Sequence, residues 1–143
     1  MKVVINVCFG GFGLSDAGVM RYLELAGKKV WPETTGKFSA LTGPTYWLVP
    51  PGPDRAKDST DDWHKWSQEE RIAHNRKWKE QVFYPRDLKR DDPLLVRVVE
   101  ELGDAANGKC ASLKAVEIPD GTDYEISEYD GNEHIAEKHR TWE

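Results

Sequence analysis

The chain has 143 residues, of which 38% are hydrophobic and 31% are charged, and it contains six Trp. A chain of this size can bury the core of one domain, and its aromatic content is typical of a folded protein rather than a disordered one. We therefore expect a single domain over residues 1–143, with a Pro-rich and charged excursion at about residues 50–66.

The sequence also argues against a membrane or secreted protein. No apolar run approaches the roughly 20 residues that span a bilayer, and the opening MKVVINVCFGG is not organised as a signal peptide. Cys8 and Cys110 lie far apart and belong to no CxxC pair, so their spacing indicates neither a disulfide framework nor a zinc site. We interpret both as buried thiols in a reducing cytoplasm, and we expect no cofactor.

Charge is unevenly distributed along the chain, whose net charge is −5. Residues 1–53 carry 5 basic and 3 acidic side chains, residues 54–92 carry 10 and 10, and residues 93–143 carry 5 and 12. The last segment therefore has a net charge of −7 (5 − 12). Because phosphate contacts depend on clusters of Lys and Arg, duplex nucleic acid is not an expected partner.

Two regular elements are predicted near the start. Residues 2–9 form a strand in this interpretation, because they are rich in β-branched side chains and end at Gly10-Gly11. The near-continuous apolar character of this strand favours a central position. Ser15 and Asp16 suit the cap of a helix over residues 16–26, which Gly27 ends.

The middle of the chain predicts short strands at 29–31 and 45–49, a loop over 50–62 and a helix over about 67–81. The helix begins at the capping box Ser67-Gln68-Glu69-Glu70. It has no broad apolar stripe, so we expect a surface helix held by one or two aromatic side chains. The aromatic residues that could clamp it to the body, or alternatively stack on a ligand, are Trp63, Trp66 and Trp78.

The last third predicts a helix and two or three strands. Asp91-Asp92-Pro93 is a typical helix start, and the apolar pattern that follows runs to Gly103. Residues 111–118 and 123–129 read as strands joined by a turn at 119–122. Asp130-Gly131 repeats the turn pattern, so residues 134–142 are a third strand or a short helix. Together these elements predict an α+β fold, with a small, mostly antiparallel sheet packed against two or three helices.

The first candidate site is the turn between the opening strand and its helix. Glycines there would let backbone N–H groups approach a ligand, and a helix N-terminus favours an anion. The turn lacks the complete dinucleotide fingerprint and the GK[ST] ending of a P-loop, so it identifies neither nucleotide-binding family. The alternative is a tight structural turn with a buried Phe12. The residues predicted to hold a phosphate are Gly10, Gly11, Phe12, Gly13 and Ser15.

The second candidate site is a basic and aromatic run within the acidic last third. In an extended strand, alternation places four of its side chains on one face, namely His134, Lys138, Arg140 and Trp142. A guanidinium fork and a flat indole suit a phosphorylated ring system. The alternative is that Lys138 and Arg140 pair with nearby acids while Trp142 closes the core.

No catalytic set is recognisable. His134 and His139 do not have the spacing of an HExxH zinc motif, and there is no GxSxG motif. The acids of residues 125–133 lack the arrangement of a calcium loop, so we expect a solvated acidic face and no metal.

Three stretches of this sequence resemble a family of small phage and prophage proteins. They are VCFGGFGLS, RDDPLLVRVVEELGDAANGKCASLKAVEIPD and YEISEYDGNEHIAEKHRTW, and the resemblance covers both ends of the chain well and residues 52–88 poorly. The family has no established activity to carry over. The resemblance implies a setting, the bacterial cytoplasm during infection, and assigns no site residues.

This setting suggests a counter-defence protein. The first hypothesis is a non-enzymatic sponge that sequesters a small phosphate-containing immune signal, such as a cyclic nucleotide or a cyclic ADP-ribose isomer, in a homo-oligomer formed through an edge strand. A second hypothesis is an inhibitor that binds a host defence protein through the Trp-rich middle, with Trp63, Trp66 and Tyr84 as contacts. A third is a small nucleotide-processing enzyme with His134 or His139 as general base.

Overall fold

The computed structural model describes residues 1–34, 43–56 and 63–139. In these ranges the fold is α+β, as predicted, with three α-helices and three small antiparallel sheets rather than one. The helices are α1 (Asp16–Leu25), α3 (Gln68–Gln81) and α4 (Pro93–Leu102). The strands are β1 (Lys2–Asn6), β2 (Trp31–Glu33), β3 (Thr45–Trp47), β4 (Val82–Phe83), β5 (Leu113–Glu117), β6 (Tyr124–Tyr129) and β7 (Asn132–Glu137). None of the helices in these ranges is long and apolar enough to cross a bilayer.

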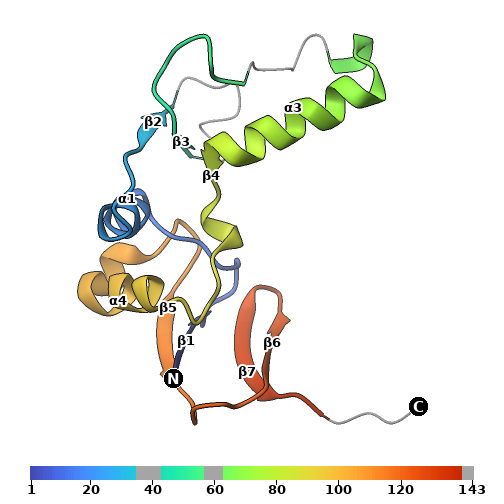
Figure 1. Cartoon of the computed structure of the whole chain (residues 1–143). Helices are drawn as coiled ribbons and strands as arrows, with labels where there is room; N and C mark the ends of the chain where they lie inside the picture. The colour runs from blue at the N-terminus through green and yellow to red at the C-terminus, as the bar shows by residue number, and fades with distance from the viewer. Residues whose placement is uncertain (35–42, 57–62, 140–143) are drawn as a thin grey trace. The chain divides into compact units, whose positions relative to one another are not determined.

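The chain divides into two compact units, and the expectation of a single domain stays a prediction. Unit 1 contains residues 1–27 and the chain from Pro85 onward, and unit 2 contains Lys28–Tyr84. Unit 1 holds α1, α4, the β1–β5 ladder and the β6–β7 hairpin (Figure 1). Unit 2 holds α3 and the three-stranded sheet β2–β3–β4.

The core of unit 1 lies between its two helices and β1. Four consecutive residues of β1, Val3 to Asn6, are buried. The predicted central position is wrong, because β1 pairs only with β5 in a two-stranded sheet of the described residues, and its burial comes from the helices and the hairpin packed around it. Leu23 of α1 and Leu95 of α4 are also fully buried, and the two helices lie side by side in Figure 1. Burial of these aliphatic side chains supplies most of the stabilisation of the unit.

Local signals set the ends of α1 and α4. The Ser15 hydroxyl accepts a hydrogen bond from the Gly18 N–H at 3.0 Å, and an Asp92 carboxylate oxygen accepts one from the Leu94 N–H at 2.8 Å. Asp92 has a second role, because its other oxygen accepts a hydrogen bond from the Tyr22 hydroxyl at 2.6 Å. Burial and this hydrogen bond raise the pKa of Tyr22 to about 12. Asp92 therefore caps α4 and also connects α4 to α1 by a hydrogen bond.

The strand pairing in the last third differs from the prediction. Residues 111–118 and 123–129 were expected to pair across their turn, whereas β5 pairs with β1, from Lys2 opposite Glu117 to Asn6 opposite Leu113. The β6 strand pairs with β7, which confirms an extended strand after Asp130-Gly131 rather than a helix. The reason is that β1 offers a buried apolar edge, so β5 gains more by pairing there than with its neighbour in sequence.

The β6–β7 hairpin meets the glycine turn through backbone contacts. The Gly10 N–H donates to the Asp130 carbonyl at 3.2 Å. Gly131 lies so close that a Cβ atom on it would be 2.3 Å from the Gly11 nitrogen and 2.8 Å from the Gly10 nitrogen. Only a residue without a side chain can occupy this position, because such distances are far shorter than any van der Waals contact.

In unit 2 the three strands are short. Trp31 lies opposite Trp47, and Trp47 lies opposite Val82, so β3 is the middle strand. Within the loop predicted over residues 50–62, the described residues 50–56 contain no helix or strand, and residues 57–62 lie outside the described ranges. Gln81 holds this loop, since its side chain accepts from the Ala56 N–H at 2.7 Å and donates to the Asp54 carbonyl at 2.7 Å.

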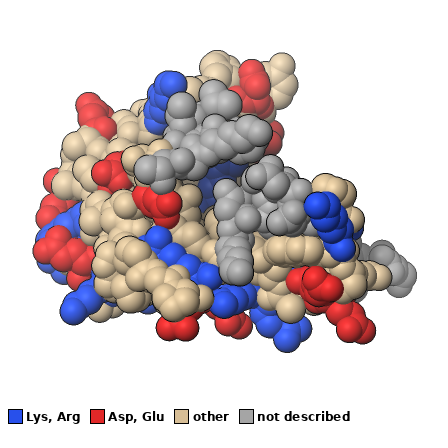
Figure 2. All heavy atoms as spheres, turned by 90° about the horizontal axis from the view of Figure 1, so that it is seen from above, with Lys and Arg blue, Asp and Glu red and all other residues tan. Residues whose placement is uncertain are grey.

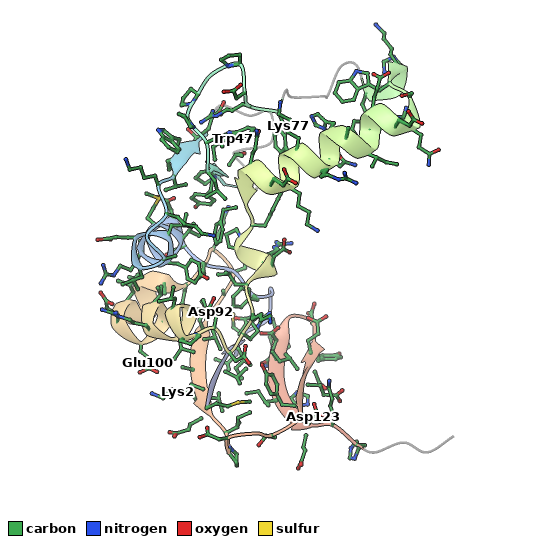
Figure 3. The ribbon with its side chains drawn as sticks, viewed as in Figure 1. Lys2, Trp47, Lys77, Asp92, Glu100 and Asp123 are labelled. Carbon is green, nitrogen blue, oxygen red and sulfur yellow. The ribbon has the colours of Figure 1, made fainter. Side chains whose placement is uncertain are left out.

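The 14-residue helix α3 contains no buried residue, as the sequence predicted for a surface helix. Ser67 caps it and accepts a hydrogen bond from the Glu70 N–H at 3.2 Å. At the other end Trp78 contacts Trp47 edge to face, with ring centroids 5.0 Å apart. The anchoring aromatic side chain is therefore at the C-terminal end of the helix (Figure 3).

Replacing Gly131 with Ala should destabilise the protein more than replacing Gly121. Both glycines have a positive φ, +86° and +78°, but a Cβ atom on Gly121 meets no atom within 4 Å. We expect Gly121→Ala to cost about 1 kcal/mol for the backbone conformation alone. Gly131→Ala should cost roughly 3 kcal/mol or more, because the hairpin must also move away from the glycine turn. Equal losses in urea unfolding of the two variants would contradict the close contact.

Candidate functional site

The glycine turn, residues 10–15, is closely packed on a second side as well. A Cβ atom on Gly10 would lie 2.6 Å from the carbonyl oxygen of Cys110. The Gly108 N–H donates to the Gly13 carbonyl at 2.9 Å, and a Cβ on Gly108 would be 2.8 Å from that same oxygen. The glycines are therefore used for contacts with the hairpin and with residues 108–110, as in the structural alternative.

The start of α1 is already occupied by groups of the chain itself. Ser15 accepts from the Gly18 N–H and donates from its hydroxyl to the Ala105 carbonyl at 2.5 Å. Its own N–H donates to the Ala106 carbonyl at 2.9 Å. Asp16 adds a carboxylate to the first turn, where it favours the helix dipole and repels a second anion. This arrangement gives the predicted phosphate site no geometric support.

Phe12, predicted to be a buried plug or a stacking surface, lies under a guanidinium group. The Cζ atom of Arg90 is 3.7 Å from the Phe12 ring centroid, a cation–π contact. The same guanidinium makes a two-bond contact with Glu133, with Nη1 to Oε1 at 2.7 Å and Nη2 to Oε2 at 2.9 Å. Phe12 is half-buried, so its flat face is already partly covered by Arg90.

The carboxylate of Glu133 is held in its charged form. Burial by itself would raise its pKa, but hydrogen bonds from Arg90 and from the Asn6 backbone N–H, together with the charge of Arg90, outweigh burial. The pKa of Glu133 therefore lies below its usual value. The side chain is 9% exposed and that of Arg90 is 20% exposed, so this ion pair is largely shielded from water.

Asn6 completes the network and is the buried polar side chain at its centre. Its amide nitrogen donates to the carbonyls of Cys8 at 2.8 Å and Gly131 at 2.7 Å, and its side-chain oxygen accepts from the Ser112 N–H at 2.8 Å. Its backbone N–H donates to Glu133 at 2.7 Å. We name Asn6, Phe12, Arg90 and Glu133 the polar cluster. The hydrogen-bond partners of Asn6 and Glu133 all lie within the chain, as expected of a structural network rather than an open ligand site.

The described C-terminal candidates are His134 and Lys138, which lie on the β6–β7 hairpin and just beyond it. His134 is exposed on β7 opposite Ser127. Lys138 lies at the open end of the hairpin, where its N–H donates to the Asp123 carbonyl at 2.8 Å and its ammonium group lies 3.6 Å from the Asp123 carboxylate. Figure 3 shows Asp123 at this open end. Arg140 and Trp142 lie outside the described residues.

The length of the hairpin separates Lys138 from the glycine turn. The turn at Gly131 contacts Gly10 and Gly11, whereas Lys138 is seven residues further along β7, a distance of about 23 Å at roughly 3.3 Å per residue. Of the described C-terminal candidates, Lys138 therefore lies far along the hairpin from the glycine turn. Lys138 instead pairs with an acidic neighbour, as in the second alternative.

The two cysteines correct another expectation. Both were interpreted as buried, but Cys110 is exposed and Cys8 is only half-buried. Their backbones are close, since the Cys8 thiol lies 3.3 Å from the Cys110 carbonyl oxygen. Within the described ranges, no group of three or more His, Cys, Asp or Glu side chains is arranged to hold a metal ion.

Unit 2 contains a cluster of aromatic rings along α3. His74 lies 5.0 Å from Trp66, 5.8 Å from Trp63 and 6.0 Å from Trp78 between ring centroids. Each of these four rings is half-buried, and Trp78 continues the row to the buried Trp47. Of the three predicted clamping residues, only Trp78 contacts the sheet, through Trp47, whereas Trp63 and Trp66 contact His74 of the helix itself. We name Trp63, Trp66, His74 and Trp78 the aromatic row.

The exposed side of α3 is basic. Residues 71–79 contain four Lys and Arg side chains and no acid, namely Arg71, Arg76, Lys77 and Lys79. Ile72 is 52% exposed among them. Acids are present elsewhere on the same helix, at Glu69, Glu70 and Glu80. On the face seen in Figure 2, apart from the grey residues, blue and red side chains are likewise interspersed.

Comparisons with known proteins add no assignment. No family model matches the chain, and neither a curated protein nor a solved structure matches it. The resemblance to phage and prophage proteins therefore stays a prediction from the sequence, and any function is inferred from the geometry of this chain.

Sequence reasoning missed the polar cluster. Arg90 lies in a run of alternating charges and Glu133 in an acidic segment, so each reads as an ordinary surface residue. They pair across 43 positions, and Asn6 reaches Glu133 across 127. The one available signal was Asn6, a polar residue at the end of an otherwise apolar strand.

Replacing Glu133 with Gln should destabilise unit 1 and weaken its pH dependence. At pH 7 we expect a loss on the order of 3 kcal/mol, because Arg90 keeps its charge without a charged partner. The folded-state pKa of Glu133 is lowered, so its contribution is complete above its usual value near 4.5 and disappears as the pH falls through the folded-state value. Wild-type stability should therefore fall more steeply below pH 4.5 than that of the variant.

The control is Glu125→Gln on β6, which removes an exposed acid from the same hairpin. Urea unfolding of the three proteins at several pH values between 7 and 3 makes the comparison. Parallel pH curves for wild type and Glu133→Gln would show that Glu133 has no lowered pKa in the folded state.

Proposed function

We propose that this chain is a non-enzymatic binding protein that attaches to an acidic surface of another protein through the exposed face of α3. The observation that carries the proposal is a 14-residue helix with no buried residue that presents Ile72 among basic side chains. A helix without an apolar stripe buries little apolar surface, so it contributes little to the stability of its own protein. Its side chains are therefore available for a partner.

The chemistry of this face favours an acidic partner. Arg76 and Lys79 are exposed and stand at i+4 and i+7 from Ile72, which puts the three on one side of the helix. Arg and large apolar side chains are enriched at the centre of protein interfaces, and complementary charge speeds the encounter. Lys77 extends the positive charge around the helix (Figure 3).

A protein partner fits these features better than a nucleic acid. The rings of the aromatic row contact one another at 5.0 to 6.0 Å, so they are engaged in mutual packing rather than open for stacking on bases. In the setting implied by the sequence, the partner is a host defence protein of the bacterial cytoplasm.

This proposal favours the second of the three hypotheses from the sequence. The sponge hypothesis stays a prediction, but Ser15 of the glycine turn and Lys138 of the second candidate site already have partners within the chain, at Ala105 and Asp123. The enzyme hypothesis gains no support, since His134 is exposed and pairs across the ladder with Ser127.

A charge reversal on α3 tests the proposal. The variant Arg76→Glu with Lys79→Glu is compared with Lys109→Glu and Lys114→Glu, two exposed cations of unit 1 that change the net charge equally. Tagged protein is expressed in bacteria, the proteins it retains are identified, and binding to each purified candidate is then measured. We expect the α3 variant to lose at least about tenfold in affinity, mostly through slower association, and the control to bind like wild type.

Three outcomes would contradict it. Equal binding by both variants would place the interface elsewhere. Retention that nuclease treatment abolishes would indicate a nucleic-acid partner. A thermal shift with cyclic nucleotides or ADP-ribose isomers, with the ligand recovered intact, would return the choice to the sponge.

A further inference from the structure

Cys8 and Cys110 are neighbours at the end of the β1–β5 ladder. The ladder continues one residue beyond its last strand pair, since the Val7 N–H donates to the Ser112 carbonyl at 2.8 Å. In this register Cys8 lies opposite Ala111, and Cys110 is the residue that precedes Ala111. The contact is direct, because the Cys8 sulfur lies 3.3 Å from the Cys110 carbonyl oxygen.

We propose that Cys8 and Cys110 form an oxidisable thiol pair, which closes to an intramolecular disulfide when the protein meets a peroxide. Cys110 is exposed and meets the oxidant first, whereas Cys8 is half-buried beside it. This site is independent of the α3 surface, which lies in the other unit. It gives a thiol modification site to a chain whose cysteine spacing indicated none.

The chemistry has two balanced steps. The peroxide transfers one oxygen atom to the Cys110 thiol, which is oxidised by two electrons to a sulfenic acid, while hydrogen peroxide is reduced to water. The Cys8 sulfur then attacks the sulfenic sulfur, the S–S bond forms and the S–OH bond breaks. The leaving hydroxyl takes the Cys8 proton and departs as a second water molecule.

The contacts around the two residues bring them close to each other. The Cys8 sulfur already reaches the backbone of Cys110, at 3.3 Å from its carbonyl oxygen. The Cys110 side chain in turn lies against the glycine turn two residues beyond Cys8, since a Cβ on Gly10 would lie 2.8 Å from the Cys110 Cβ atom. Disulfides require Cα atoms roughly 4.4 to 6.8 Å apart, so closure of the bond tests whether the two thiols reach each other from these positions.

The cost of losing the thiol contacts is small. The Cys8 sulfur lies 3.4 Å from the Asn6 side-chain oxygen, and that oxygen keeps its hydrogen bond from the Ser112 N–H at 2.8 Å after oxidation. The buried amide therefore stays satisfied. The new bond would join the end of β1 to the segment before β5, next to the glycine turn, and should raise the melting temperature.

Stoichiometric hydrogen peroxide added to the reduced, folded protein tests the proposal. We expect the intact mass to fall by two hydrogen atoms and non-reducing peptide mapping to join the peptides of Cys8 and Cys110. The same treatment in urea should be at least about tenfold slower, because folding supplies the proximity of the two sulfurs. A reductant should reverse the change in mass and the rise in melting temperature.

Two single variants separate the steps. In Cys8→Ser, Cys110 should form a sulfenic acid that dimedone traps, and in Cys110→Ser the protein should react much more slowly. A disulfide between two molecules, or sulfinic acid on Cys110 without a disulfide in the wild type, would overturn the proposal. So would equal rates of disulfide formation in the folded and the urea-unfolded protein.

Discussion

The two-bond ion pair between Arg90 and Glu133 is the contact on which the arrangement of unit 1 depends. It joins the segment before α4 to β7, while the guanidinium covers Phe12 of the glycine turn and the carboxylate accepts from the backbone of β1. The hairpin β6–β7 has only two strands, and a two-stranded hairpin is marginally stable in water by itself. Without the polar cluster it would lack a fixed place against β1, because only short side chains and backbone groups meet at Gly10, Gly11 and Gly131.

The glycine turn illustrates how one sequence pattern serves two physical purposes. Glycines between a strand and a helix free the backbone to approach either a phosphate or another part of the same chain. Here Gly131, Gly108 and Cys110 supply that other part, and Ser15 and Asp16 supply the oxygen atoms that an anion would otherwise bring to the helix. The distinction depends on residues 90 or more positions away, such as Ala105, whose carbonyl accepts from the Ser15 hydroxyl.

Unit 2 has the opposite character. Its strands are two or three residues long and its helix buries nothing, so much of its apolar and aromatic surface stays partly accessible. The aromatic row stiffens α3 from the capping region to Trp47, and Arg71 adds a cation–π contact at 5.4 Å from the Trp63 ring centroid. A rigid helix with an exposed basic face pays little ordering entropy when it binds, which suits a docking element.

The sequence by itself determined the local elements. The three helices are capped as predicted, by Ser15, Ser67 and Asp92. Two of them are followed by a glycine with positive φ, namely Gly27 after α1 and Gly103 after α4. The α+β class follows from these elements. Such signals act over three or four residues, so a linear pattern contains them. Only the tertiary structure decided the long-range contacts. These are the pairing of β5 with β1 and the packing of Gly131 against the glycine turn. They also include the ion pair between Arg90 and Glu133 and the contact between Cys8 and Cys110. These contacts join residues 43 to 121 positions apart. Each forms because it buries more apolar surface or satisfies more hydrogen bonds than the alternative pairings of the same segments, and a local sequence pattern does not contain that comparison.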